Sequence, residues 1–294
     1  MPELISFVDH PPLHEPVLIV ALEGWIDAGA AAAGAVRTIL TEHDSEPVAF
    51  FDTDQLLDHR ARRPVMTINE GVMGPLTWPS IELRAVTDST GRHVLLLVGA
   101  EPDHGWGMFV DAVRDTALAL GVTTVIGLGA YPAPVPHTRD AQLALTSTSE
   151  AIVESHPRYV RGTVEVPAGV QAAIEVAAAD AGVSSMGLWA QVPHYISGLP
   201  YATASLRLIE GLDQVAGLRF ETGALMIEAE TGRHQLDELV AANDQHRAMV
   251  TQLEELYDSQ APTAINSDDV GLGPLPTGDE LAAEVQAFLR DQGD

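Results

Sequence analysis

The chain of 294 residues contains 15 Lys+Arg against 42 Asp+Glu, so its formal net charge is -27. This balance disfavours binding to nucleic acid or to an anionic membrane surface, because both need clustered basic side chains. The sequence has no cysteine, which excludes disulfides, thiolate nucleophiles and cysteine-ligated zinc.

Hydrophobic residues make up 46% of the chain and aromatic residues only 5%, so the core must consist mainly of Ala, Val, Leu and Ile. This length suits one large α/β domain, or a domain with a helical appendage. No apolar run reaches the roughly 18 residues that a membrane-spanning helix requires. The start of the chain lacks the basic and apolar regions of a signal peptide. We therefore expect a cytoplasmic protein that does not enter a membrane.

The first predicted elements are a strand, a turn and a helix. Val17–Leu22 is a short apolar run typical of a buried strand. The alanine-rich stretch Ala28–Leu40 predicts a thin helix that can lie close to a sheet or another helix, with Asp27 as its N-cap. Val48–Phe51 predicts a second strand, and the charged segment Asp52–Pro64 predicts a loop with at most one helical turn.

Two strands joined by a polar turn follow. Ile81–Val86 and His93–Val98 are apolar, and Gly91 between them suits a positive φ. The spacing of apolar residues in Trp106–Leu120 predicts a helix, and the run Val122–Leu128 predicts another strand. A strand, a helix and a strand in this order indicate a right-handed parallel crossover.

The remaining elements of the body complete an α/β pattern. They are short strands at Leu143–Thr146 and Val164–Val166, a helix over Ala168–Ala181, a strand over Met186–Val192 and a helix over Ala202–Val215. The whole pattern predicts an α/β fold with a central mixed, mostly parallel sheet flanked by helices. We assign residues 1–222 to this core domain.

The C-terminal part of the chain has a mainly helical pattern. Residues 223–258 carry about three heptads, with Leu236, Asn243, Val250 and Tyr257 seven residues apart. Either a helix or helical hairpin packs on the body, or the heptads form a seam for self-association. Residues 259–278 are rich in Pro, Gly and Asp and predict a linker. Residues 279–294 predict an amphipathic helix that docks on its own body or on a partner.

Polar residues that follow the predicted strands define one candidate cleft, because strand ends are where α/β sheets form clefts. The candidate residues are Gly24, Trp25, Asp27, Glu101, Asp103, Trp106, His137, Thr138, Arg139, His194 and Tyr195. The chain contains no P-loop, zinc-protease motif or serine nucleophile elbow. We expect no metal and no cofactor, and the pattern assigns no catalytic residue.

The turn from Gly24 to Gly29 has the position of a phosphate-binding turn but not its chemistry. Glu23 and Asp27 place negative charge at the start of the helix, where an anion would otherwise bind. A metal-bridged or neutral polar ligand is compatible with this charge. We favour the simpler interpretation of a structural turn with Trp25 as a packing residue.

A second polar group follows the strand His93–Val98. Glu101, Asp103 and His104 lie close together there, just before a helix that starts near Trp106. Two carboxylates and one imidazole can perform acid–base catalysis or hold a metal ion. The alternative, which we favour, is that Asp103 or a neighbouring group caps the helix and Trp106 packs against the body.

The remaining candidates lie at two Pro-His dipeptides, Pro136-His137 and Pro193-His194. In the first, His137-Thr138-Arg139, the arginine can bind an anionic group through two parallel hydrogen bonds. Because the chain has so few cations, we favour a structural pairing of this arginine with Glu101 or Asp27. In the second, His194-Tyr195 donates hydrogen bonds either into the same cleft or to backbone carbonyls.

A set of short motifs, in this order along the chain, resembles that of a known family. The motifs are Leu22–Gly29 (LEGWIDAG), Gly99–Asp103 (GAEPD) with Trp106, Pro136–Arg139 (PHTR), Val166–Gly169 (VPAG), Val192–Tyr195 (VPHY), Pro200–Tyr201 (PY) and Leu253–Asp258 (LEELYD). Over about residues 15–258 the chain is similar to the bacterial branch of the proteasome-assembly-chaperone family, of the second-chaperone (PAC-two-like) type. The order and spacing of the motifs carry the resemblance.

The resemblance implies a fold like that of purine nucleoside phosphorylases, with a central mixed sheet flanked by helices. It implies a non-catalytic, homo-oligomeric assembly chaperone or interaction protein, with a trimer expected from the fold and proteasome subunits as candidate partners. Some archaeal relatives dock on the proteasome through a hydrophobic-Tyr tail, and the final residues Arg290–Asp294 lack that pair. The alternative is a small-molecule enzyme or sensor of the nucleosidase or phosphorylase kind that uses the candidate cleft.

Overall fold

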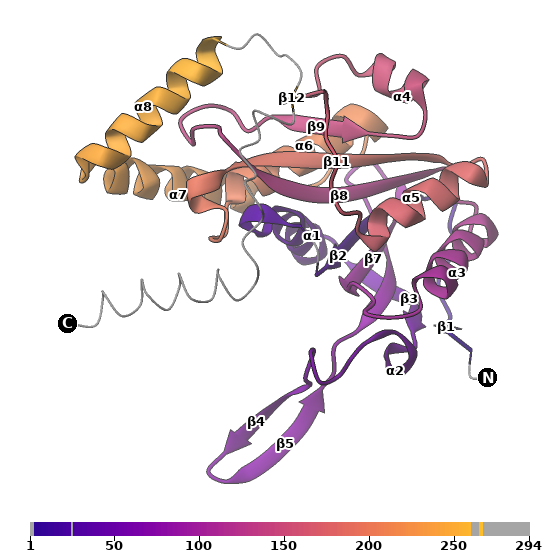
Figure 1. Cartoon of the computed structure of the whole chain (residues 1–294). Helices are drawn as coiled ribbons and strands as arrows, with labels where there is room; N and C mark the ends of the chain where they lie inside the picture. Colours follow the sequence, from indigo (N-terminus) through magenta and orange to yellow (C-terminus); the bar gives the residue numbers. More distant parts are fainter. Residues whose placement is uncertain (1–2, 25, 260–264, 267–294) are drawn as a thin grey trace.

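Four of the predicted apolar strands lie side by side at the centre of an eight-stranded sheet (Figure 1). The computed structural model describes residues 3–24, 26–259 and 265–266. The strand order of the sheet is β1-β3-β6-β7-β2-β8-β11-β9. Its strands are β1 (Ile5–Phe7), β2 (Val17–Glu23), β3 (Ser45–Phe51), β6 (Ile81–Thr87), β7 (His93–Ala100), β8 (Thr124–Ala133), β9 (Leu143–Thr146) and β11 (Ser184–Pro193).

The sheet is parallel in its centre and antiparallel at both sides. β2 pairs in parallel with β7 and with β8, and β8 pairs in parallel with β11. β6 runs antiparallel to both β7 and β3, and β9 runs antiparallel to β11. The predicted mixed sheet flanked by helices is therefore confirmed, but three of its seven strand pairs are parallel and four are antiparallel, so it is not mostly parallel. β7 and β8 are parallel as expected, with β2 between them.

Helices cover both faces of this sheet. They are α1 (Ala31–Glu42), α2 (Thr53–Leu56), α3 (Trp106–Ala119), α4 (Glu150–Ser155), α5 (Val170–Asp180), α6 (Ala202–Ala216), α7 (Gly223–Ala241) and α8 (Asp244–Ser259), with short 3-10 turns η1 (Ala28–Ala30) and η2 (His194–Ile196). α1 and α6 pack on one face, and α3 and α5 pack on the other. Along β2, Val17 and Ile19 face the first pair whereas Leu18 and Val20 face the second. Because both faces are buried, this central strand is an uninterrupted apolar run.

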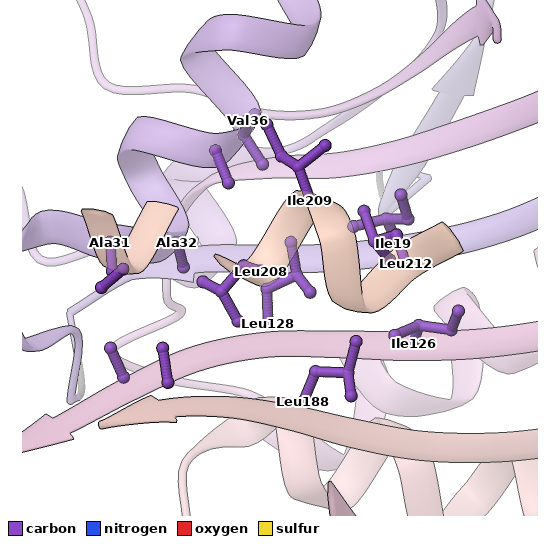
Figure 2. Close-up of a cluster of buried hydrophobic side chains, with 14 of the residues drawn as sticks. Ile19, Ala31, Ala32, Val36, Ile126, Leu128, Leu188, Leu208, Ile209 and Leu212 are labelled. Atoms are coloured by element: carbon purple, nitrogen blue, oxygen red, sulfur yellow. The ribbon is translucent and has the colours of Figure 1, made fainter. Parts of the chain in front are cut away.

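The alanine-rich helix α1 lies close to both the sheet and α6, as its thin profile predicts. A Cβ atom added at Gly34 would lie 2.3 Å from the Oγ atom of Ser205 in α6. Ala31 and Ala35 are fully buried at the same contact. Figure 2 shows side chains of α1, α6 and the strands β2, β8 and β11 meeting in one apolar cluster.

Part of the structure differs from the sequence-based expectation. A β-hairpin, β4 (Val65–Asn69) with β5 (Val72–Thr77), projects from the body (Figure 1), and the pattern did not predict it. The strand predicted at Val164–Val166 is wrong, since both valines are exposed and no core orders them as a strand. Instead, the two-residue strand β10 (Gly162–Thr163) pairs in parallel with β12 (Ile265–Asn266).

The C-terminal helical region is a hairpin, which is one of the two alternatives left open by its heptads. The chain turns between α7 and α8, and the side chain of Asn243 accepts hydrogen bonds from the amides of Gln245 (2.9 Å) and His246 (3.4 Å). Asn243 therefore caps α8 rather than occupying a coiled-coil seam. No helix within the described residues combines the length and apolarity needed to cross a membrane.

The predicted division of the chain into four parts stays a prediction. Apart from Ser259 and Ile265–Asn266, the linker at 259–278 and the helix at 279–294 lie outside the described residues.

Candidate functional site

The turn after β2 is built to begin α1. The carboxylate of Asp27 accepts hydrogen bonds from the amides of Ala32 (2.8 Å) and Ala33 (3.0 Å). Asp27 thus caps the helix through its side chain, as predicted, although η1 intervenes and Ala30 adopts a positive φ of 47°. Burial raises the pKa of Asp27, and the backbone amides of α1 act against that effect. Trp25, which was expected to pack in this turn, lies outside the described residues.

An open pocket lies beside this turn. Its volume is about 310 Å³, and its walls come from β2, β7 and α1. Apolar side chains such as Val36, Leu40 and Val98 form most of the lining, and the charged residues of the pocket are Glu23, Asp27 and Arg37.

The second predicted group, Glu101 and Asp103, follows β7 and forms hydrogen bonds to neighbouring segments of the chain. The Oε1 atom of Glu101 accepts a hydrogen bond from the amide of Val170 (2.7 Å), at the start of α5. Asp103 accepts from the amide of Asp58 (2.8 Å) and from Nε of Arg62 (3.3 Å). The expectation that Asp103 or a neighbouring group caps α3 is therefore wrong, because the carboxylate of Asp103 turns toward residues 58–62 and the N-cap position is Gly105.

Gly24 and Trp106 belong to the same neighbourhood. Gly24 has a φ of 139°, and a Cβ atom there would lie 2.7 Å from Nη2 of Arg62 and 3.1 Å from Cβ of Glu101. Only glycine permits this approach of the Arg62 side chain to the turn. The indole Nε1–H of Trp106 donates to the carbonyl of Pro102 (2.6 Å), while the ring stays 37% exposed.

The residues that follow the first Pro-His dipeptide bind the C-terminal α7–α8 hairpin. Thr138 donates from its hydroxyl to Oε1 of Glu254 (2.5 Å). Arg139 forms a two-bond pair with Asp258, through Nε (2.9 Å) and Nη2 (2.7 Å), and a third bond from Nη1 to Glu254 (3.1 Å). Arg139 therefore has a structural role, as predicted, but its partners lie on α8. The expected pairing of Arg139 with Glu101 or Asp27 is wrong.

His137 is buried between a strand end and α7. The hydroxyl of Tyr195 accepts a hydrogen bond from the amide of His137 (2.8 Å) and lies 2.6 Å from its Nδ1. The carboxylate of Asp237 can only accept, so Nε2–H donates to its Oδ1 (3.2 Å), and the neutral imidazole then accepts at Nδ1 from the Tyr195 hydroxyl. Tyr195 and Asp237 thus hold one tautomer of the neutral imidazole.

Burial is the main influence on the pKa values of His137 and Tyr195. It lowers the pKa of His137, although Asp237 and Glu254 act in the opposite direction. It also raises the pKa of Tyr195 to about 12, so the hydroxyl keeps its proton at neutral pH. His194, in contrast, is exposed, and its ring contacts Tyr195 edge-on with the centroids 5.5 Å apart.

The described candidate residues therefore fall into separate groups. Gly24, Glu101, Asp103 and Trp106 lie near the ends of β2 and β7, where Gly24 and Asp103 adjoin Arg62. The residues His137, Thr138, Arg139 and Tyr195 lie past β8 and β11, where they contact α7 and α8.

Sequence reasoning missed the partners of the second group, which are Asp237, Glu254 and Asp258. The acidic motif at Leu253–Asp258 was the available signal, because it gathers three carboxylates in a chain that has only 15 Lys+Arg. A buried carboxyl on α5 was also missed. Glu175 packs against Gly127 and Gly187, and burial raises its pKa to about 7. Within the described residues, no group of three His, Asp or Glu side chains is arranged to hold a metal ion.

Comparison with known proteins gives the chain its lineage. No curated protein matches it. Residues 21–240 match the model of the PAC2 family. A structure of a protein of unknown function from Corynebacterium glutamicum ATCC 13032 is similar, with a TM-score of 0.82 and 31% identity over 87% of this chain and 97% of that chain.

Two further structures have names that mention the proteasome. A Mycobacterium tuberculosis proteasome-assembly chaperone homologue has a TM-score of 0.73 and 29% identity, covering 80% of this chain and 99% of its own. An archaeal proteasome activator from Pyrococcus furiosus shares the fold, with a TM-score of 0.61 at 14% identity over 80% of this chain and 97% of that chain. With a family model that spans residues 21–240 and a structural match at 31% identity, this chain belongs to the PAC2 family.

Proposed function

We propose that this protein is a non-catalytic, homo-oligomeric interaction protein of the cytoplasm that takes part in proteasome assembly. The observation that carries the proposal is the use of the predicted cleft residues in internal contacts. Glu101 binds the start of α5, Asp103 binds residues 58–62, and Arg139 binds α8. Side chains engaged in this way support the fold rather than a reaction. The likeness to a Mycobacterium tuberculosis proteasome-assembly chaperone homologue supports the connection with the proteasome.

The helical hairpin α7–α8 is suited to contact a partner. Its inner side is held to the strand ends by hydrogen bonds and ion pairs. α7 also exposes the apolar residues Met226, Ile227 and Leu239 at different positions around its surface. A rigid element that presents apolar side chains to solvent is a common basis of protein recognition.

The proposal is tested by assembling proteasome α-subunits of the same organism with and without the full chain. We expect the tagged chain to retain α-subunits and to raise the yield of α-rings, measured by native mass spectrometry. Arg139→Ala, which frees α8, should reduce retention, whereas Arg114→Ala, which breaks ion pairs only within α3, should not. Equal ring yields with the chain, without it and with an unrelated acidic protein would refute the proteasome role.

The open pocket beside α1 favours a second candidate, a small-molecule enzyme or sensor. Its volume of about 310 Å³ lies at the lower end of the range for ligand sites, and carboxylates stand beside an apolar wall. Nucleosides, with and without phosphate, are the compounds to screen by thermal shift. A ligand of this pocket should raise Tm for the wild type and for Asp103→Asn, which lies outside the pocket, but not for Glu23→Gln. If no compound raises Tm, this candidate is lost.

A further inference from the structure

The open pocket beside α1 lies at a topological switch of the sheet. β2 and β7 are parallel neighbours, but the helices that follow them lie on opposite faces, α1 after β2 and α3 after β7. β2 leads through α1 to β3, and β7 leads through α3 to β8, so the chain leaves the two strands in opposite directions. In α/β sheets, ligands bind in the crevice outside the carboxyl ends of two such strands. The pocket of about 310 Å³ opens at this position, since Glu23 and Gly99 from the two strand ends line it.

One face of α1 forms the long wall of this pocket. Its lining positions recur at the helical period and extend over about 14 Å of helix, at a rise of 1.5 Å per residue. On the sheet side, Ala21 of β2 and Val98 of β7 are cross-strand partners. The pocket is therefore a groove between a helix and a sheet, and small side chains such as Ala33 keep it open. The lining residues from α1 are Ala32, Ala33, Val36, Arg37, Leu40 and Thr41.

The polar groups of the groove are distributed unevenly along it. Two carboxylates, Glu23 and Asp27, lie at the end where α1 begins, whereas Val36 and Leu40 give the rest of the helix wall an apolar surface. Each carboxylate oxygen of Asp27 accepts one backbone amide, at 2.8 and 3.0 Å, and each can accept a second hydrogen bond. Among the residues that the structure describes, no cation forms an ion pair with Glu23 or Asp27.

The positive charges near the groove are already balanced. Arg37 points a largely exposed side chain toward Glu228 of α7, at 3.9 Å. On β6, Glu82 is the cross-strand partner of Val98 and pairs with Arg84 at 3.1 Å, so this pair adds no net charge. The two carboxylates at the start of α1 therefore set the charge of the groove, in a chain whose formal net charge is -27. A cleft lined by one sign of charge concentrates ions of the opposite sign.

We propose that this groove binds a small organic amine, with its ammonium group beside Glu23 and Asp27 and its aliphatic body along Val36, Leu40 and Val98. Burial of the aliphatic body against the apolar wall supplies affinity, and the carboxylates fix the orientation of the ligand. The same carboxylates repel an anion of equal shape, which gives the site its selectivity. This inference deepens the second candidate function and rests on it, because it names the class of ligand for the same pocket.

The test titrates the full-length chain with hexylamine, 1-hexanol and hexanoate, which share one aliphatic chain and differ in charge. Ligand-observed NMR at neutral pH and low salt gives the three dissociation constants. Hexylamine should bind the wild type about tenfold more tightly, or better, than the alcohol or the acid, because its contact with the carboxylates is charge-assisted.

Three variants locate the bound amine. Glu23→Gln, at an exposed side chain, should lower the affinity for hexylamine to that for 1-hexanol. Ala33→Leu fills the groove and should abolish binding of both, while its backbone amide still bonds to Asp27. The control Glu42→Gln removes the same charge from an exposed position on α1 outside the lining, and it should bind hexylamine as the wild type does. Circular dichroism checks that each variant is folded.

The outcomes separate the class of ligand from the existence of the site. Equal affinity for hexylamine and 1-hexanol, or tighter binding of hexanoate, would overturn the assignment of an amine. Wild-type binding of hexylamine by Ala33→Leu would overturn it as well, since the amine would then lie elsewhere. If 1-hexanol or a nucleoside binds and Ala33→Leu abolishes that binding, the second candidate function stands without the amine. If neither these probes nor the nucleosides bind, both are rejected.

Discussion

The α7–α8 hairpin and the β4–β5 arm (residues 65–77) are both two-segment extensions of the same body, and they are held in opposite ways. Three consecutive residues, His137-Thr138-Arg139, bind the helical hairpin through Asp237, Glu254 and Asp258. The arm leaves the body with exposed apolar side chains and contacts it only at its base.

This difference shows how much of each extension is stabilised by contacts within its own chain. The helical hairpin finds complementary polar and charged groups within its own chain, so its position is determined without a second molecule. The arm carries surface that its own chain does not cover, and the hydrophobic effect favours covering that surface by association. One extension is fixed by its own chain, and the other leaves its apolar side chains exposed to solvent.

The largest expected effect comes from removing the buried imidazole that holds α7. His137→Ala leaves the Tyr195 hydroxyl and the Asp237 carboxylate without their partner, which should lower the free energy of unfolding by about 1–3 kcal/mol. Urea unfolding followed by circular dichroism measures it. His194→Ala, one strand away and exposed, should change it by less than about 0.5 kcal/mol. Equal losses of unfolding free energy in both variants would show that His137 contributes no more to stability than an exposed histidine.

A pH dependence confined to the helical hairpin is the next expected effect. Because the pKa of His137 is lowered in the folded protein, the unfolded chain binds more protons below the ordinary histidine value of about 6.5. The stability contributed by His137 is therefore complete above that pH and is lost as the pH falls toward its folded pKa. Its charged neighbours are Asp237, Glu254 and Arg233.

Hydrogen exchange at pH 7.5 and 5.5, corrected for intrinsic rates, measures this effect. Protection of α7 and α8 should fall at the lower pH in the wild type but not in His137→Ala. The arm serves as an internal reference, because Glu70 is its only titratable residue. Protection of α7 that rises at pH 5.5 would contradict the assignment of a neutral His137.

A smaller effect is expected from the ion pairs of α8, because they are partly exposed to solvent. Arg139→Ala should speed proteolytic cleavage within α8 several-fold, and Arg139→Lys should recover only part of the protection, since lysine cannot form the two parallel bonds to Asp258. Quantitative limited proteolysis gives the rates, with Arg114→Ala as the matched surface control. Full recovery by lysine would indicate that charge alone, without two-bond geometry, holds α8.

The smallest expected effect on folding is in the arm. Met73→Glu should change the free energy of unfolding by less than about 0.5 kcal/mol, because the side chain already faces solvent. Urea unfolding followed by circular dichroism measures it. A much larger loss would mean that the arm packs on its own body, and the contrast between the two extensions would then disappear.

The sequence by itself determined the elements whose signals are local. Apolar runs such as Val17–Leu22 indicated the buried parallel strands, because a strand covered on both faces carries no polar residue. Alanine and glycine in Ala28–Leu40 indicated a thin helix, and Asp27 was recognisable as its cap. The ordered short motifs indicated the family, and Arg139 was correctly expected to have a structural partner.

Only the tertiary structure decided which partners those are. Arg139 and Asp258 are 119 residues apart, and no local pattern states that one helix returns to that loop. The candidate cleft divided because each strand end meets a different neighbour, α5 and residues 58–62 on one side and α7–α8 on the other. The arm went unpredicted because both its faces are exposed, so no alternation of apolar and polar residues marks its strands. Alternation of apolar and polar residues arises where one face is buried, and a hairpin exposed on both faces lacks it.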